Sequence, residues 1–137
     1  MALRVFRAME QAGLEPCFVA RDRRLEHLGP VLVEDLSGEA HPLNGVVAAL
    51  EAGGGVLAPC DVPWLPPQAF SRLTEGSAVV GCPLLARLDA SWLPRAQEHL
   101  ETGASVRSFV SVATPIELPL PWLRNVNRPT DLDRDTP

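Results

Sequence analysis

Two short apolar runs of the sequence are each followed by an aspartate, and these aspartates are the side chains best placed for chemistry. Residues 31–33 lead to Asp35, and residues 56–58 lead to Asp61. If both runs are parallel strands, both carboxylates lie at the carboxyl edge of one sheet, where open α/β proteins bind ligands. There they could hold Mg²⁺ or hydrogen-bond a nucleotide. The competing interpretation is that each aspartate only forms a turn, because Asp and Pro commonly end strands.

A second polar group lies near the C-terminus, where Asn125 and Asn127 are separated by one residue. Side chains two positions apart on an extended segment project from the same face. The two amides could therefore ligate a metal-bound phosphate or orient a substrate. The ordinary alternative is a turn before a helix that starts near Thr130, since asparagine is common in such turns.

The segment His41-Pro42-Leu43-Asn44-Gly45 precedes a predicted helix. The first turn of a helix offers unpaired N–H groups to anions, and a glycine allows a ligand to approach the backbone closely. Ordinary capping is the alternative. A role for His41 as a general base lacks a partner in the sequence, and no Ser/His/Asp or Cys/His arrangement is evident, so no catalytic residue is assigned.

The pattern along the chain predicts an α/β layered fold in one domain, residues 1–137. The predicted strands are continuous apolar runs, which is typical of parallel sheets covered by helices on both faces. A doubly wound fold normally opens with a strand, whereas this chain opens in a helix. The expected helices cover 2–12, 42–52, 66–73, 91–100 and 104–109, and the expected strands cover 17–20, 31–33, 56–58 and 77–82.

Composition excludes several classes of protein. The net charge of −5 argues against a nucleic-acid partner, which needs a basic surface. No apolar run approaches the ~20 residues that span a bilayer, and no signal peptide is visible. The cysteines Cys17, Cys60 and Cys82 form no CxxC pair and predict reduced, buried thiols in the cytoplasm. All 12 basic residues are arginine, so the chain has no lysine.

Taken together, VEDLSGEAHPLNGVVAALEAG, VLAPCDVPWLP and RNVNRPTDL resemble the molybdenum cofactor guanylyltransferase family, also described as molybdopterin-guanine dinucleotide biosynthesis protein A. The resemblance runs from about Ala2 to Leu132. It implies a Rossmann-like, three-layer α/β/α nucleotidyltransferase fold with a mostly parallel sheet. It also implies Mg²⁺ and the transfer of GMP from GTP to molybdopterin, with release of pyrophosphate.

The resemblance also implies roles for individual residues. Asp61 matches a metal-binding aspartate, and Asp35 matches an aspartate that contacts the guanine nucleotide. The family has a Pro-Leu-x-Gly loop, and glycine is usual at the position before it, where this chain has His41. Ala20 falls where family members often have an asparagine. The remaining matches are Pro42, Leu43, Asn44 and Gly45 with that nucleotide-binding loop, and Asn125 and Asn127 with the paired asparagines on the substrate and metal side.

The sequence differs from the family pattern at its N-terminal end. The first strand, the glycine-rich phosphate loop and the essential lysine of the family have no counterpart here. Either Met1 is an internal methionine of a longer reading frame, or the chain is a remnant in which a second copy could cover the exposed strand edge. We therefore expect weak or absent transferase activity from these 137 residues. The alternatives are a non-enzymatic nucleotide-binding, pterin-binding or assembly module, and a folded remnant without a ligand.

Overall fold

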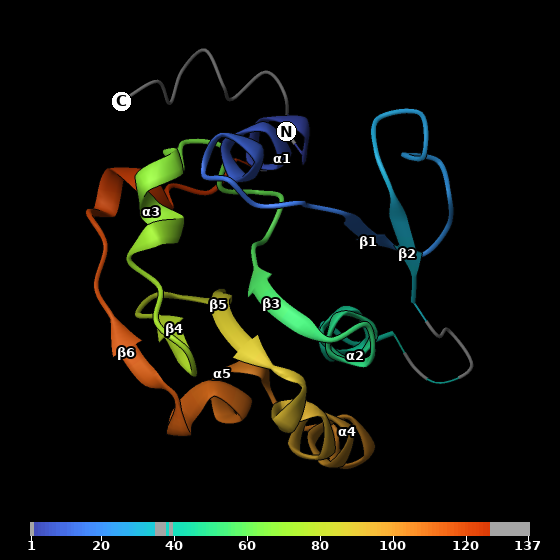
Figure 1. Ribbon diagram of the computed structural model, residues 1–137. Helices are drawn as coiled ribbons and strands as arrows, with labels where there is room; N and C mark the ends of the chain where they lie inside the picture. Colours follow the sequence, from blue (N-terminus) through green and yellow to red (C-terminus); the bar gives the residue numbers. More distant parts are fainter. Residues whose placement is uncertain (1, 35–37, 39, 127–137) are drawn as a thin grey trace.

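The computed structural model describes residues 2–34, 38 and 40–126, which alternate between helices and strands (Figure 1). The α-helices are α1 (Ala2–Gln11), α2 (Leu43–Glu51), α3 (Pro67–Ser71), α4 (Leu93–Thr102) and α5 (Val106–Phe109). The strands are β1 (Phe18–Ala20), β2 (Val31–Val33), β3 (Gly54–Leu57), β4 (Ser77–Val79), β5 (Cys82–Asp89) and β6 (Thr114–Ile116). Three 3₁₀ turns complete the order, η1 (Ala90–Trp92), η2 (Val110–Val112) and η3 (Leu120–Leu123).

The strands form two sheets, and all but β5 run in one direction. β1 and β2 pair in parallel, and the second sheet has the order β3-β5-β4-β6. β5 is antiparallel to both β3 and β4, whereas β4 and β6 are parallel. α2 connects β2 to β3 and packs on β1, β2 and β3. A helical crossover of this kind joins parallel strands, so β3 runs in the same direction as β1 and β2. The expected mixed α/β fold with mostly parallel strands is confirmed.

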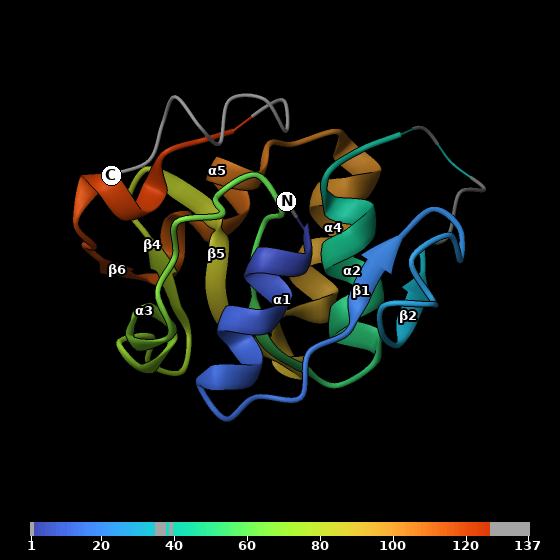
Figure 2. The same ribbon diagram turned by 90° about the horizontal axis from the view of Figure 1, so that it is seen from above.

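Helices cover both faces of the strands, as Figures 1 and 2 show. β5 belongs to both cores because its side chains alternate: Leu85 packs on one side, while Ala86 and Leu88 pack on the other. The first core is built by α1, α3 and the residues around them, with Val5, Ala8, Val62, Leu65, Ala69, Phe70 and Leu73. The second is built by α2, α4 and α5, with Leu43, Val46, Leu50, Ala96 and Phe109. The result is the expected three-layer α/β/α arrangement.

The predicted strand 77–82 was wrong in extent. The chain reverses after Val79, and β5 returns antiparallel to β4. β5 and β6 were not predicted, because Pro83 and Pro115 interrupt sequences that otherwise suit strands. Both prolines are accommodated, Pro83 at the second residue of β5 and Pro115 in β6, whose single paired neighbour is β4.

Gly54 sets how closely β3 approaches β5. Its φ is +75°, and a Cβ atom there would lie 2.4 Å from the carbonyl oxygen of Leu88. Only glycine satisfies both the backbone conformation and the close contact. Within the part of the chain that the structure describes, no helix has the length and apolar character needed to cross a membrane.

Candidate nucleotide site

Asp61 lies in a turn four residues beyond the end of β3, on the side of the carboxyl end of that strand, and it is half-buried. Its carbonyl oxygen accepts a hydrogen bond of 2.7 Å from the backbone N–H of Val126. Val126 is fully buried, whereas its neighbour Asn125 is exposed. The contact thus brings two of the predicted site segments side by side, although they are 64 positions apart in the sequence (125 − 61).

Buried residues that follow Asp61 in the sequence fix the turn that carries it. Val62 is 0% exposed and Leu65 is 4% exposed, and both belong to the core under α1 and α3. Pro66 is extended, with φ −79° and ψ 161°, and Pro67 then occupies the first turn of α3. The apolar residues after Asp61 therefore anchor the turn, and the prolines direct the chain into the next helix.

The Pro42–Gly45 segment forms the first turn of α2. The backbone N–H of Leu43 donates to Nδ1 of His41 at 3.0 Å, and the N–H of Asn44 donates to the His41 carbonyl oxygen at 3.0 Å. His41 therefore accepts two hydrogen bonds from the first turn of α2, although Pro42 is the N-cap residue and has no side-chain cap bond. Leu43 is completely buried in the core, and Asn44 is 9% exposed. Their predicted contacts with a nucleotide would therefore have to come from atoms other than those packed in the core.

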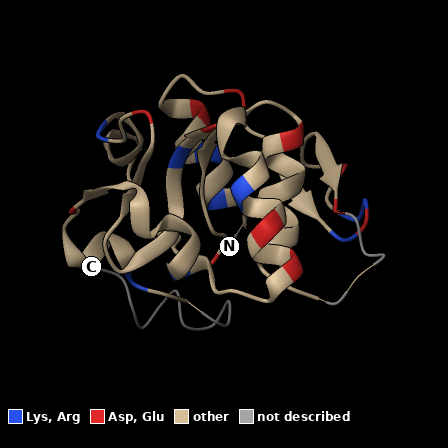
Figure 3. Cartoon of the chain, turned by 90° about the horizontal axis from the view of Figure 1, so that it is seen from below, with Lys and Arg blue, Asp and Glu red and all other residues tan. Residues whose placement is uncertain are grey.

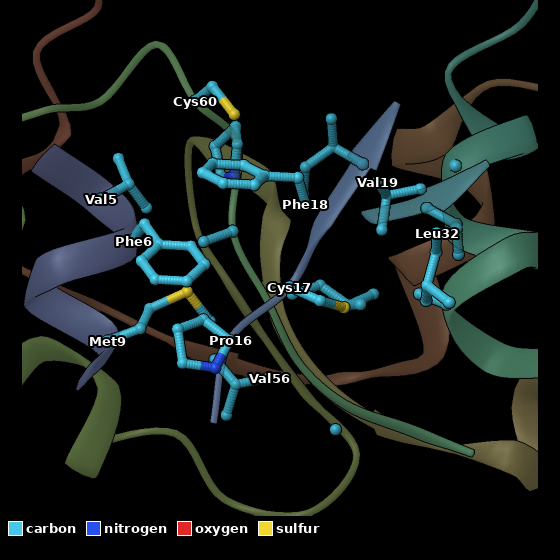
Figure 4. Close-up of a pocket in the computed structure, with 18 of the residues that line it drawn as sticks. Val5, Phe6, Met9, Pro16, Cys17, Phe18, Val19, Leu32, Val56 and Cys60 are labelled. Carbon is cyan, nitrogen blue, oxygen red and sulfur yellow. The ribbon is translucent and has the colours of Figure 1, made fainter. Parts of the chain in front are cut away.

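Gly45 lies close to β1 and to the residue that follows β2. A Cβ atom at this position would lie 3.6 Å from Val19 and 3.7 Å from a carboxylate oxygen of Glu34. Pro42 and Gly45 both border a hollow of about 580 Å³ between β1 and β3, which we name the interstrand groove (Figure 4). The loop from Ala58 to Cys60, just before Asp61, borders the same groove. The groove thus connects the start of α2 with the turn that follows β3.

A smaller pocket of about 340 Å³ lies at the carboxyl ends of β1 and β2. Arg21 directly follows β1 and Glu34 directly follows β2, and both line this pocket together with His41 and Pro42. Glu34 was not singled out as a site residue in the sequence, although its position immediately after a parallel strand is a signal that could have identified it.

Arginines are the basic residues of the chain, and several of those in the described part contact aromatic rings or backbone carbonyl oxygens. Figure 3 shows basic and acidic residues interspersed over the view from below. Several arginines are engaged in packing: Arg4 lies 4.9 Å from the ring centre of Trp64, and Arg72 lies 5.0 Å from that of Trp122. Arg95 donates to the carbonyl oxygens of Ser108 and Phe109, each at 2.8 Å. These arginines stabilise helices and loops.

Not every predicted site residue can be placed. Asp35 and Asn127 lie outside the described residues, so the pairing of Asp35 with Asp61 and of Asn127 with Asn125 stays a prediction. In residues 2–34, 38 and 40–126, no group of three His, Cys, Asp or Glu side chains gathers as a metal site would require. Asp61 therefore remains a single predicted oxygen ligand.

The three cysteines are free, but the expectation that all are buried was wrong. Cys82 is buried, whereas Cys17 and Cys60 are exposed because both lie beside the interstrand groove. Partial burial raises the pKa of all three thiols. The negative charge of Asp61 adds to this effect at Cys60 and Cys82, so the carboxylate lies within electrostatic reach of both.

The Cys82 thiol is expected to make stability depend on pH in the alkaline range. Burial, and secondarily the Asp61 charge, raise its pKa from 9.0 to about 11. The unfolded chain therefore loses this proton at lower pH than the folded chain does. The stabilisation is complete below pH 9 and is lost as the pH rises toward 11, by about 2–3 kcal/mol.

Urea unfolding between pH 8 and pH 11 would measure this loss directly. The chain has no lysine and no tyrosine, so Cys17 and Cys60 are the other side chains that titrate in this window. The Cys82→Ala variant should have a lower stability at pH 8 but a much flatter decline. A decline of equal steepness in the variant would show that another group causes it.

The layered strands and the polar residues at their carboxyl ends define the class of α/β proteins that bind ligands at this edge. A model of the MobA-like NTP transferase domain family matches residues 1–111, and the chain belongs to this family. A search of curated proteins finds no match.

Solved structures show the same fold. The crystal structure of the protein Aq1419 from Aquifex aeolicus VF5 aligns with a TM-score of 0.73 at 14% identity, over 93% of this chain and 79% of that one. Molybdopterin-guanine dinucleotide biosynthesis protein A from Archaeoglobus fulgidus aligns with a TM-score of 0.67 at 22% identity, over 96% of this chain and 83% of that one. These likenesses show the fold, and the family model confirms the MobA-like nucleotidyltransferase family that the sequence motifs indicated.

Proposed function

We propose that the chain is a molybdenum cofactor guanylyltransferase-like protein that binds a guanine nucleotide at the carboxyl edge of its strands. The observation that carries this proposal is the hydrogen bond from the Val126 N–H to the Asp61 carbonyl oxygen. It joins the turn after β3 to the segment that holds Asn125, next to a groove that reaches Gly45. Membership in the MobA-like family supports the same assignment.

The residues at this edge fit a hard cation. Mg²⁺ prefers oxygen ligands and usually binds one or two carboxylates together with substrate phosphates. Asp61 offers a half-buried carboxylate, and Asn125 offers an exposed amide oxygen on the adjoining segment. We propose Asp61 as the metal ligand, with Asn125 and Asn127 beside it and Asp35 on the nucleotide. Bound Mg²⁺ would neutralise charge on the triphosphate.

The proposed reaction is the attack of a molybdopterin phosphate on the α-phosphate of GTP, with pyrophosphate as the leaving group. The contribution of the chain would be electrostatic and positional, since phosphoryl transfer needs little covalent participation from protein groups. The sequence has no lysine to stabilise the leaving pyrophosphate. We therefore expect turnover by this chain to be weak or absent. The cytoplasm is the proposed location, consistent with three free thiols.

Binding of GTP without turnover is the second candidate, that of a nucleotide-binding, pterin-binding or assembly module. The observation that favours it is the absence of lysine from the sequence, because no ammonium group is present to stabilise the leaving pyrophosphate. The two candidates share the Asp61 site and differ only in whether pyrophosphate is released.

Calorimetric titration of GTP with Mg²⁺ tests the site. We expect Asp61→Asn to weaken binding at least about tenfold, because the substitution removes a carboxylate beside the metal and keeps the side-chain shape. Glu101→Gln is the matched control, since Glu101 is an exposed acid at the end of α4 and should not affect binding. Equal affinity of the two variants would exclude Asp61 from the site. Pyrophosphate release in the presence of molybdopterin then separates transfer from binding alone.

A further inference from the structure

The pocket at the carboxyl ends of β1 and β2, which we name the strand-end pocket, carries opposite charges on separate side chains. Arg21, Glu34 and His41 line it together with Ala40 and Pro42. Among the described residues, the ion pairs include neither Arg21 nor Glu34, so both charged groups are available to a ligand. We propose that this pocket takes the guanine base of the nucleotide and that Glu34 and His41 select it. This inference rests on the proposed function.

The imidazole ring of His41 is held by a hydrogen bond on one side. Its Nδ1 accepts from the backbone N–H of Leu43 at 3.0 Å. A ring nitrogen that accepts carries no hydrogen, so the hydrogen of the neutral ring is on Nε2. His41 is half-buried and lines the strand-end pocket. It therefore offers the pocket one N–H donor on a ring whose orientation is fixed.

The carboxylate of Glu34 is positioned by β2 and by the start of α2. The Glu34 N–H donates to the carbonyl oxygen of Ala20 at 2.9 Å, which continues the pairing of β2 with β1. One carboxylate oxygen would lie 3.7 Å from a Cβ atom at Gly45. Because glycine has no side chain, a flat ring can approach the carboxylate on that side. Glu34 is half-buried and supplies two adjacent acceptor oxygens.

Guanine is the purine base that matches these groups. Its N1–H and its 2-amino group are adjacent donors, which one carboxylate accepts together. Its O6 and N7 atoms are adjacent acceptors, which suit the Nε2–H of His41 and the guanidinium of Arg21. Adenine would place the lone pair of N1 against the Glu34 carboxylate and an amino group against the donors. The pocket chemistry therefore favours guanine over adenine.

The place of the strand-end pocket agrees with a nucleotide whose phosphates lie near Asp61. α2 connects β2 to β3, and β3 runs in the same direction as β1 and β2. The pocket and the Asp61 turn therefore lie at the same edge of the strands, on either side of the first turn of α2. The pocket volume of about 340 Å³ is in the ordinary range of ligand pockets.

Calorimetric titration of GTP, inosine triphosphate and ATP, each with Mg²⁺, tests the role of Glu34. We expect GTP to bind about tenfold more tightly than inosine triphosphate, which lacks the 2-amino group, and about a hundredfold more tightly than ATP. Glu34→Gln replaces one acceptor by an amide donor. It should reduce the preference for GTP over inosine triphosphate to about one and strengthen ATP binding. Glu101→Gln is the control and should keep all three ratios, because Glu101 is exposed and lies in α4.

Two substitutions of His41 separate its contact with the base from its contact with α2. His41→Asn keeps an acceptor for the Leu43 N–H but removes the second donor, so GTP and inosine triphosphate should both bind about tenfold more weakly at unchanged thermal stability. His41→Gln carries an amide N–H at about the reach of Nε2 and should bind GTP better than His41→Asn does. His27→Asn is the control, since His27 is exposed and does not line the pocket.

The Asp61→Asn variant distinguishes this inference from the proposed function. It should weaken the three nucleotides equally and leave their ratios unchanged, since Asp61 is proposed to act on the phosphates. If Asp61→Asn weakens GTP binding but Glu34→Gln leaves the preference for GTP over inosine triphosphate intact, the inference fails and the proposed function stands. Altered ratios in Glu34→Gln with full affinity in Asp61→Asn would support the base pocket and remove the metal site. Absence of nucleotide binding by the wild-type chain would overturn both.

Discussion

Replacement of Phe6 by alanine is expected to lower the free energy of unfolding by about 3–5 kcal/mol. The Phe6 ring is 9% exposed and stacks on Phe18 with ring centres 4.7 Å apart. It also lies against Gly29, where a Cβ atom would be only 2.7 Å from the ring. One side chain of α1 thus contacts both β1 and the loop that leads to β2. Its removal leaves a cavity where the two-stranded sheet meets the rest of the molecule.

Urea unfolding followed by circular dichroism would measure this loss. Phe6→Leu keeps most of the apolar volume and should cost clearly less. Val80→Ala is the surface control, since Val80 is 51% exposed and its truncation should change stability little. Because Phe6 also lines the interstrand groove, Cys17 should react faster with thiol reagents in the Phe6→Ala variant. A loss below about 1 kcal/mol would show that the stacked pair does not hold the β1–β2 sheet in place.

The layered fold was predictable because its signals are local. The apolar runs at 31–33 and 56–58 and the helix that starts near Pro42 each fall within a few residues of the observed elements. The alternation of these elements then restricts the topology to parallel strands with helical crossovers. The carboxyl edge follows from that topology, so the general position of Asp61 could be predicted as well.

The features that the sequence did not predict depend on contacts between distant parts of the chain. β5 contains Pro83 and is held as a strand by pairing with both β3 and β4, which no local pattern shows. Cys17 precedes the apolar run 18–20 and Cys60 follows the apolar run 56–59, yet both thiols are exposed because the groove opens beside them. The contact between Asp61 and Val126 likewise joins two residues that lie 65 positions apart in the sequence (126 − 61). Spacing along the chain carried none of this information.

Replacement of Val126 by aspartate is expected to detach the C-terminal segment from the Asp61 turn. Val126 is 0% exposed, so its replacement would place a carboxylate without a partner in a buried position next to a backbone carbonyl. The cost of about 3 kcal/mol corresponds to roughly a hundredfold larger population of the opened segment. Hydrogen exchange would report it as loss of protection at residue 126, while the amides of β4 and β5 stay protected.

The same substitution links the packing to the proposed function. If Asn125 acts beside Asp61, release of the segment should weaken the binding of GTP with Mg²⁺ at least as much as Asp61→Asn does. Val112→Asp introduces the same charge at an exposed position and should leave both hydrogen exchange and binding unchanged. Val126→Thr keeps the side-chain shape and should give intermediate values. Binding that persists after the segment opens would assign the nucleotide to Asp61 and the α2 turn alone, because the turn after β3 is anchored independently by Val62 and Leu65.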